Sequence, residues 1–256
     1  MKKLVLGLLL LGTVWTVAAA DLTRAEVEQR LKQANKSHVA DLKRKDLTDI
    51  DLSGLDFRNA NLWGSDLRRS NFSNSVLSGL VLDLTVMTKT NFSHADLSNT
   101  SVFGVSVGGA NLSHANLSGS RFIAILDRAD LSYANLSNSD WGADMKNQSM
   151  GLMRASMNHV NLTGADLSNI NLDRATLRYA NFTNSKLINA NLFGVDLSGA
   201  DFSNADLSGA NLTGTNLEET NFTGANLAGT RFAGIKDKAK LKGLSEAKNL
   251  DKAIFD

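Results

Sequence analysis

The chain of 256 residues contains no proline and no cysteine, and only 6% of its residues are aromatic. The absence of cysteine excludes a disulfide framework, a thiolate metal site and a lipid anchor on an N-terminal cysteine. The absence of proline is typical of a backbone whose N–H groups are all needed for hydrogen bonds between neighbouring strands. Basic and acidic residues almost balance, at 27 and 26. The length and composition therefore indicate one elongated domain with no strong overall charge.

What the chain does contain is a hydrophobic residue at every fifth position. The clearest run is GADFSNADLSGANLTGTNLEETNFTGANLAG, from Gly199 to Gly229. The central Leu or Phe residues begin at Leu42, keep this spacing to Phe122, and return to it before the end of the series at Phe232. A period of five fits neither an amphipathic helix nor a half-buried strand, so it indicates an internal repeat.

Each unit of five has a direct physical interpretation. A small residue such as Ala95, Ala165 or Ala200 stands two positions before the centre, so both would point to the same side of an extended backbone. The Asp or Asn between them, and the Ser or Thr after the centre, would point to water. Pairs such as Ser53-Gly54 at the end of a unit are good turn formers. Each unit is therefore expected to form one short side of a coil.

Spacings of 20 residues indicate four sides in each turn of the coil. Asparagines recur at this interval, and two sets of Phe residues would stack as columns: Phe72 with Phe92, and Phe122 in phase with Phe182, Phe202 and Phe222. The predicted fold is all-β: a right-handed, quadrilateral, parallel β-helix. Its roughly ten turns would lie about 4.8 Å apart. Stability in such a solenoid comes from stacking of neighbouring turns.

The repeat resembles the pentapeptide-repeat family, whose pattern is A-(D/N)-L-X-X. The segments ANLSHANLSGS, ADLSYANLSNS and ADLSGANLTGT match it closely, and the resemblance covers residues 39–234. It implies the four-sided, right-handed β-helix and supplies no catalytic residues. Members of the family include quinolone-resistance proteins that mimic DNA toward type II topoisomerases, and many secreted or lumenal proteins.

The first 20 residues predict an export signal. Lys2 and Lys3 precede an apolar stretch over residues 4–17, and three alanines end at Ala20. This order is typical of a signal peptide cleaved after Ala20, and the apolar stretch is short for a membrane span. The alternative is an uncleaved N-terminal anchor. We expect a periplasmic or secreted protein without stable membrane insertion after cleavage.

Both ends of the repeat are expected to carry caps. Over residues 21–38, Thr23 and Glu26 have the spacing of a capping box, and Val27, Leu31 and Ala34 would share one helical face. Residues 235–256 depart from the repeat and offer several apolar side chains to the last turn: Leu241, Leu244, Leu250, Ile254 and Phe255. Such caps prevent end-to-end strand pairing.

The repeat is irregular over residues 123–151. After Phe122 the centres come one residue early, at Leu126 and onward, and the original frame returns only after an insertion. A bulge followed by a small loop is expected. The side chains in this stretch either fill a deformed core or form a partner surface, and the candidates are Trp141, Met145, Met150 and Met153.

A second departure lies at outward positions. Trp63, Phe103 and Ile123 fall in one phase of the 20-residue turn, where Ser or Thr is usual. Outward valines also replace Asp or Asn at three successive units: Val76, Val81 and Val86. An exposed apolar stripe of this kind predicts a surface for a protein partner or a second copy of the chain, although single exposed hydrophobic residues are common.

The chain carries no recognisable chemistry. It has no nucleophile motif, phosphate-binding loop or zinc spacing, so no catalytic, cofactor-binding or metal-binding residue is assigned. His94 and His114 are 20 residues apart, but are interpreted as surface residues rather than a metal site.

Charge helps to choose between the remaining functions. Residues 46–235 hold 18 acidic and 12 basic residues. DNA carries about one charge per 1.7 Å of its axis, so this surface is a weak mimic. The prediction is an exported, non-catalytic interaction or scaffold protein that binds an unidentified protein partner or itself, and no nucleic acid. The alternative is a DNA-mimicking protein that binds topoisomerases.

Overall fold

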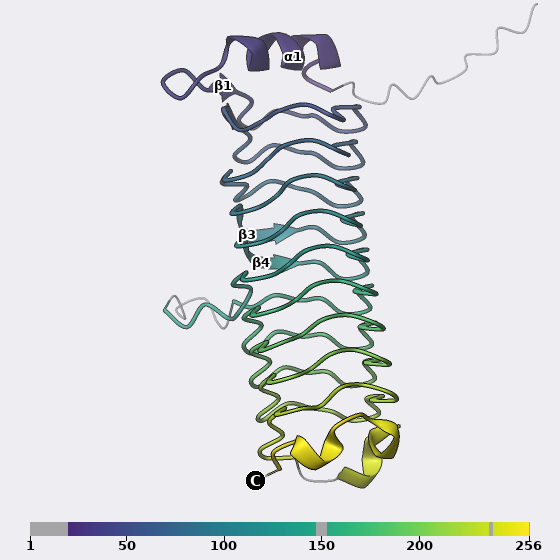
Figure 1. Cartoon of the computed structure of the whole chain (residues 1–256). Coiled ribbons are helices and arrows are strands. Elements are labelled where there is room, and N and C mark those ends of the chain that lie inside the picture. Colours follow the sequence, from purple (N-terminus) through teal and green to yellow (C-terminus); the bar gives the residue numbers. More distant parts are fainter. Residues whose placement is uncertain (1–19, 147–152, 236–237, 256) are drawn as a thin grey trace, which may run out of the picture.

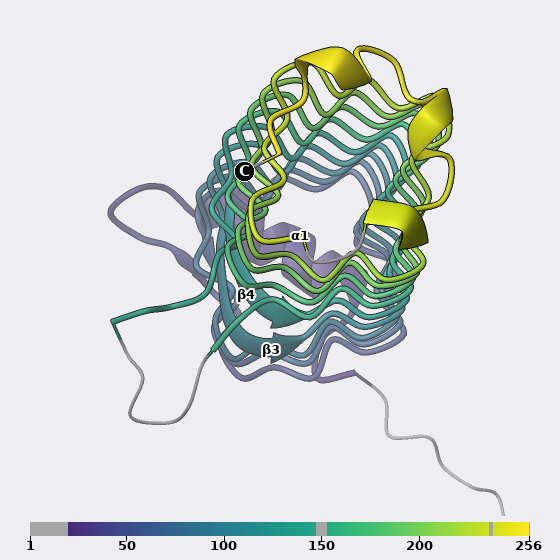
Figure 2. The same ribbon diagram turned by 90° about the horizontal axis from the view of Figure 1, so that it is seen from below.

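The chain forms a tall column of stacked turns (Figure 1). The computed structural model describes residues 20–146, 153–235 and 238–255. Helix α1 (Arg24–Gln33) lies at one end of the column and the C-terminal segment at the other. Figure 2 looks along the column and shows the turns superimposed as one closed outline. Within the residues that the structure describes, no helix is long and apolar enough to cross a membrane.

Parallel bridges join each turn to the next. β1 (Ala40–Asp41) pairs with β2 (Ala60–Asn61), and β3 (Ser101–Ser106) pairs with β4 (Arg121–Ile125), both in parallel. Most other sides contribute a single bridge, such as Asp51 to Asn71, again 20 residues apart. The named strands are few because each five-residue side turns before a longer strand can form. The hydrogen bonds therefore run along the column.

The polar residues of the repeat build the corners. The outward Asp or Asn accepts a hydrogen bond from the N–H two residues later, as Asp46 Oδ1 does from Thr48 at 2.9 Å. The last turn residue adopts the left-handed conformation, for example Asn74 with a φ of 59° and Gly54 with a φ of 71°. Asn and Gly tolerate this conformation best, which explains why Ser-Asn and Ser-Gly close so many units.

The interior is filled by the central residues. The rings of Phe182 and Phe202 stack with centroids 4.5 Å apart and planes 9° from parallel. Outside the core, Asn91 Nδ2 donates to Asn71 Oδ1 at 3.0 Å, which continues the predicted side-chain ladder. On this side of the column, buried ring stacking inside thus runs parallel to a side-chain amide ladder outside.

The predicted assignment of Phe122 to the Phe182 column is wrong. Phe122 stacks instead on Trp141, with centroids 4.8 Å apart. The bridges show that Phe72 and Phe92 share the column of Phe182, because they link Asn91, Asn111, Asp130, Asn161 and Asn181 in succession. In the irregular stretch, the number of residues between bridged positions changes from 20 to 19 and then to 31. Every later residue therefore lies on a different side from the one that a constant spacing of 20 predicts.

Helix α1 starts at the predicted capping box. The Thr23 N–H donates to a Glu26 carboxylate oxygen at 2.7 Å, and the Thr23 hydroxyl accepts from the Glu26 N–H at 3.4 Å. Val27 is fully buried, and Leu31 and Ala34 pack partly buried against the first turns. The predicted apolar face of the helix is confirmed.

The C-terminal segment folds as one more, irregular turn. Its corners are the 3-10 helices η2 (Lys238–Lys240), η3 (Leu244–Glu246) and η4 (Leu250–Lys252). Leu241, Leu244, Leu250 and Phe255 pack on the core as predicted. Ile254 does not, because it occupies the outward position that bridges to Arg231, and its side chain is exposed.

The irregular stretch contains both predicted features. The register shifts by one residue between Phe103 and Ser106 relative to β4. The insertion then leaves the column after Trp141, and the Asp144 N–H donates to the Met153 carbonyl oxygen at 2.8 Å where the chain returns. Figures 1 and 2 show these flanking segments projecting from the side of the column. The predicted signal peptide, Ala20 excepted, lies outside the described residues.

Candidate interaction face

The predicted apolar residues lie along one corner of the column. Lys43, Trp63, Asp83, Phe103 and Ile123 each follow a central residue by one position, 20 residues apart. β1, β2, β3 and β4 fix this register from turn to turn. We call this set the corner column. The insertion after Trp141 leaves the stack at the same corner, one turn beyond Ile123.

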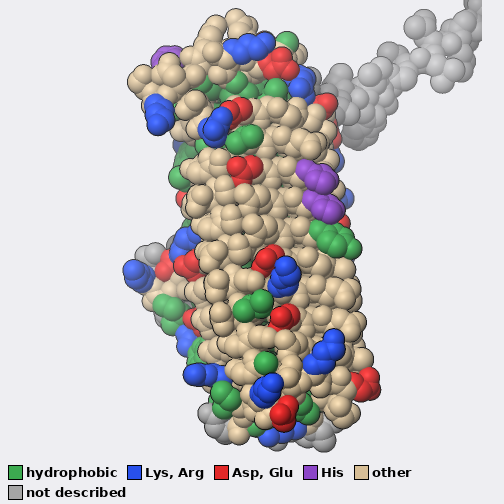
Figure 3. All heavy atoms as spheres, in the orientation of Figure 1, with side chains coloured by type: hydrophobic (Ala, Val, Ile, Leu, Met, Phe, Trp, Pro, Cys, Tyr) green, Lys and Arg blue, Asp and Glu red, His purple; other side chains and the backbone are tan. Residues whose placement is uncertain are grey.

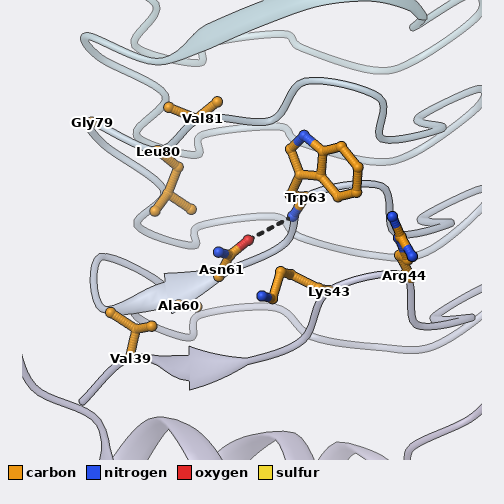
Figure 4. Close-up of a pocket in the computed structure, with 9 residues that line it drawn as sticks. All are labelled: Val39, Lys43, Arg44, Ala60, Asn61, Trp63, Gly79, Leu80 and Val81. Carbon is orange, nitrogen blue, oxygen red and sulfur yellow. Dashed lines mark hydrogen bonds between the residues drawn. The ribbon is translucent and has the colours of Figure 1, made fainter.

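A hollow of about 770 Å³ opens beside Trp63. Figure 4 shows the indole on one side, aliphatic side chains on the other, and two cationic side chains below. We call it the Trp63 hollow, and its lining residues are Val39, Lys43, Arg44, Ala60, Asn61, Trp63, Gly79, Leu80 and Val81. Trp63 is half-buried, and its backbone N–H donates to Asn61 Oδ1 at 3.0 Å. This corner hydrogen bond fixes the backbone that carries the indole.

Two exposed aliphatic side chains line this hollow. The relative exposure is 48% for Val39 and 55% for Val81. Val86 is exposed as well, whereas Val76 is half-buried. The three outward valines do not form one patch, because Val76, Val81 and Val86 belong to three different bridge columns and so lie on successive sides of the coil. Only Val81 borders the hollow, and Figure 3 shows hydrophobic side chains only in scattered groups among charged ones.

The cations of the hollow differ from the arginines on neighbouring turns. Arg69 donates to Asp49 at 2.5 and 2.7 Å, and Arg58 pairs with Asp56. These hydrogen bonds hold the pKa of each carboxyl below its ordinary value. In the described part of the chain, the side chains of Lys43 and Arg44 form no ion pair. The Arg44 guanidinium instead lies over the Trp63 ring, 5.0 Å from its centroid.

Ile123 does not extend the exposed column, and that prediction is wrong. Its side chain is only 1% exposed. The centres Phe122 and Leu126 are four residues apart, so only three residues connect them and the usual two-residue turn has no room. β4 runs straight through the corner instead, and Phe122, Ile123 and Ala124 are buried in succession. Phe103, one turn earlier, remains half-buried.

Trp141 is also removed from the candidate surface. It is fully buried, stacks on Phe122, and donates from Nε1 to Ser120 Oγ at 3.1 Å. Of the two interpretations left open by the sequence, Trp141 follows the core-filling one.

The methionines of the insertion have different environments. Met145 is exposed, and its Sδ accepts from Arg174 at 3.2 Å. Met153 is half-buried at the base of the insertion, where its carbonyl accepts from Asp144. Met150 lies outside the described residues.

Sequence reasoning missed Phe193, which belongs to the corner column beyond the insertion. The bridges Asp140–Asn171 and Asn171–Asn191 place it one turn after Asp173 in the same column. The Arg174 guanidinium lies over the Phe193 ring, 5.5 Å from its centroid. This arrangement is similar to that of Arg44 over Trp63. A count of 31 rather than 20 residues across the insertion would have found it.

The two histidines stack face to face. The rings of His94 and His114 are 4.7 Å apart and 5° from parallel, and Tyr133 continues the stack at 5.0 Å. Among the described residues, no group of three or more His, Cys, Asp or Glu side chains could hold a metal ion. Ring stacking along the column accounts for this arrangement.

Comparison with known proteins concerns the repeat region. The family model described as pentapeptide repeats matches residues 40–74, 65–101, 104–140, 155–194 and 190–229. No curated protein matches the chain.

Several solved structures are similar to this chain. HetL, a pentapeptide repeat protein involved in heterocyst differentiation regulation in Nostoc sp. strain PCC 7120, is 28% identical over 91% of this chain and 94% of its own, with a TM-score of 0.32. A pentapeptide repeat protein from the Arabidopsis thaliana thylakoid lumen is 34% identical over 38% of this chain and 61% of its own, with a TM-score of 0.30. QnrB1, a plasmid-mediated fluoroquinolone resistance protein, is 21% identical over 82% of this chain and 93% of its own, with a TM-score of 0.43.

Proposed function

The chain belongs to the pentapeptide-repeat family, and we propose that it is an exported, non-catalytic member that binds another protein through the Trp63 hollow. The observation that carries the proposal is the apolar lining beside an aromatic ring and two cations. Aromatic rings and arginines in a partly desolvated pocket are the usual anchors of protein interfaces.

The proposal includes a right-handed, quadrilateral β-helix as the scaffold. Parallel bridges at 20-residue spacing, with four five-residue units between bridged residues, support it. Such a scaffold places side chains from distant repeats on one rigid face. The Trp63 hollow draws its lining from three successive turns in this way.

Export is part of the same proposal. The basic start, the apolar stretch over residues 4–17 and the alanines up to Ala20 support a cleaved signal and a periplasmic or secreted protein. Cell fractionation, with sequencing of the N-terminus, tests this. Asp21 is the expected first residue of the mature protein.

The charge distribution favours this function over topoisomerase binding. A DNA mimic requires a dense anionic face, whereas Figure 3 shows acidic and basic side chains interspersed. Exposed ion pairs such as Arg68 with Asp66 neutralise acidic positions within the repeat.

The test is cross-linked co-purification of the full chain with proteins of the cell envelope. The variant combines Trp63→Ser with Val81→Asn, which are residue types usual at those positions of the repeat. Tyr179→Asn, an exposed substitution on another corner, is the control. We expect the wild type and the control to retain the same partner, and the double variant to lose it.

Sedimentation of the purified proteins distinguishes self-association from a different partner. A dimer of the wild type that the double variant loses would identify a second copy as the partner. An identical set of cross-linked proteins in all three samples would contradict the proposal.

A further inference from the structure

The hydrogen-bond ladder between turns is interrupted in the upper column between Leu62 and Val81. One turn before, the Leu42 N–H donates to the Asn61 carbonyl at 3.0 Å, and one turn after, the Leu82 N–H donates to the Ser101 carbonyl at 2.8 Å. The corresponding bond from the Leu62 N–H to the Val81 carbonyl is missing. Neither N–H, of Leu62 or of Val81, has a hydrogen-bond partner among the residues that the structure describes.

The acceptors at this place are open too. Val86 donates to the Ser65 carbonyl at 3.0 Å on the next side. The equivalent acceptors here, the carbonyls of Ala60 and Val81, receive no hydrogen bond from the described residues. Backbone groups in folded proteins are almost always paired, so a local exception needs an explanation.

The opening coincides with the Trp63 hollow. Ala60 and Leu80 line the hollow and are 7% and 8% exposed, whereas equivalent inward residues such as Ala95 and Ala110 are 1% exposed. The two turns therefore separate slightly here. Open backbone groups, aliphatic walls and two cations meet in one hollow.

We propose that this hollow binds an extended protein segment in which aliphatic and acidic residues alternate. The segment's backbone would exchange hydrogen bonds with the Val81 N–H and the Ala60 carbonyl, as an added strand does at an open sheet position. Its aliphatic side chains would contact Val39 and Leu80, and its carboxylates would pair with Lys43 and Arg44. The proposal rests on the protein-binding function above and specifies the chemistry of the partner.

The surroundings of the hollow carry the matching charge. Residues 35–45 hold four Lys or Arg and one Asp, so an acidic segment is attracted to this end of the column.

A nucleic acid fits the hollow less well. Phosphate contacts dominate its binding and require several cations along the strand, whereas one wall here is aliphatic. Open backbone donors and acceptors match another backbone, which a peptide supplies and a lipid surface does not.

Fluorescence anisotropy of a labelled peptide tests the proposal on the full chain. The probe is a peptide of alternating leucine and aspartate, and the matched probes replace aspartate by lysine, leucine by serine, or carry N-methylated amides. We expect the Leu/Asp peptide to bind most tightly, because it alone supplies all three contacts. Its affinity should fall as salt screens the cations. No binding up to about 1 mM, the weak end of specific association, would overturn the proposal.

Protein variants separate the contributions. Lys43→Gln with Arg44→Gln should weaken binding about tenfold, because two exposed charge contacts are lost. Arg128→Gln with Lys186→Gln removes the same charge elsewhere and should leave the affinity unchanged. Equal binding by both double variants would refute the carboxylate contact, and equal binding of the N-methylated peptide would refute backbone pairing.

The outcomes also separate this inference from the proposed function. One outcome is that Trp63→Ser abolishes binding while the charge variants and the N-methylated peptide behave like their controls. The hollow would then be a protein-binding site, as the proposed function states, but the carboxylate and backbone contacts proposed here would be refuted. If Trp63→Ser has no effect, the hollow is not the binding site. Another outcome is that a single-stranded DNA oligonucleotide binds more tightly than the peptide and loses this binding in the Lys43/Arg44 variant. That result would overturn the proposal and identify a nucleic acid as the ligand of the hollow.

Discussion

Gly243 gives the sharpest test of how the C-terminal segment closes the column. It precedes η3, has a φ of 65°, and lies against the backbone of Thr223 in the preceding turn. An added Cβ would stand 2.6 Å from the Thr223 nitrogen and 2.8 Å from its Cα, besides meeting the hydroxyl. These backbone atoms cannot swing aside, because the bonds from Lys242 to Thr220 and from Phe222 to Lys242, at 2.9 and 2.8 Å, hold the two segments together.

Gly243→Ala therefore has two costs that a matched control separates. Gly214 has a φ of 68° and no atom within 4 Å of an added Cβ, so Gly214→Ala should cost only the left-handed penalty, about 1–2 kcal/mol. Overpacking adds about 1–3 kcal/mol, so Gly243→Ala should lower the free energy of unfolding by about 2–5 kcal/mol.

Urea unfolding followed by circular dichroism measures both values, and hydrogen exchange locates the change. Because stability in repeat proteins depends on neighbouring units, we expect faster exchange over residues 238–255 in Gly243→Ala and unchanged exchange there in Gly214→Ala. Equal losses of stability in the two variants would refute the close packing of Gly243 on Thr223.

Three further changes test the core, a buried hydrogen bond and an acid-sensitive corner. Phe202→Ala removes a fully buried ring that stacks on both neighbouring turns and should lower the free energy of unfolding by about 3–5 kcal/mol; a loss below 1 kcal/mol in urea titration would contradict the stacked core. Ser120→Ala leaves the buried Nε1 of Trp141 without its acceptor and should cost about 1–3 kcal/mol, a loss that Ser120→Thr should largely avoid. The hydrogen bond from the Ser53 N–H holds the pKa of Asp51 below its ordinary value, so its stabilising contribution is present above the unfolded pKa, about 3.9, and is lost as pH falls through the lower folded pKa. Melting temperatures from pH 7 to pH 3 should fall less in Asp51→Asn than in the wild type, and identical curves would count against this contribution.

The period of five was sufficient to predict the stacking of turns, because every residue type in a unit has one place. The centre fills the core, the Asx side chain closes the corner, and the residue after Ser is left-handed. Thr23 with Glu26 likewise predicted the start of α1, since a capping box is local. These features depend only on residues close together in the chain, so they can be predicted from the sequence.

Features that depend on counting across the irregular stretch were not predicted. The Phe columns were assigned on a constant spacing of 20, but the deletion before Leu126 and the insertion after Trp141 move later residues by two sides. The burial of Ile123 was nevertheless readable from the sequence. Three residues between Phe122 and Leu126 cannot form a two-residue corner, so the residue after Phe122 must take an extended conformation and turn inward.

The Trp63 hollow illustrates the opposite case. The sequence keeps its period through Leu62 and Val81, yet two ladder hydrogen bonds are missing there. Around β4 the sequence breaks its period, but the chain restores its bridges and buries the odd residues. The chain tolerates the missing residue before Leu126, because the neighbouring side chains become buried in the core and the bridges to the next turn still form. An opened backbone between regular turns has no such internal repair, and its unpaired groups can be satisfied only by water or by a ligand. This opening beside the Trp63 hollow is therefore where binding is expected.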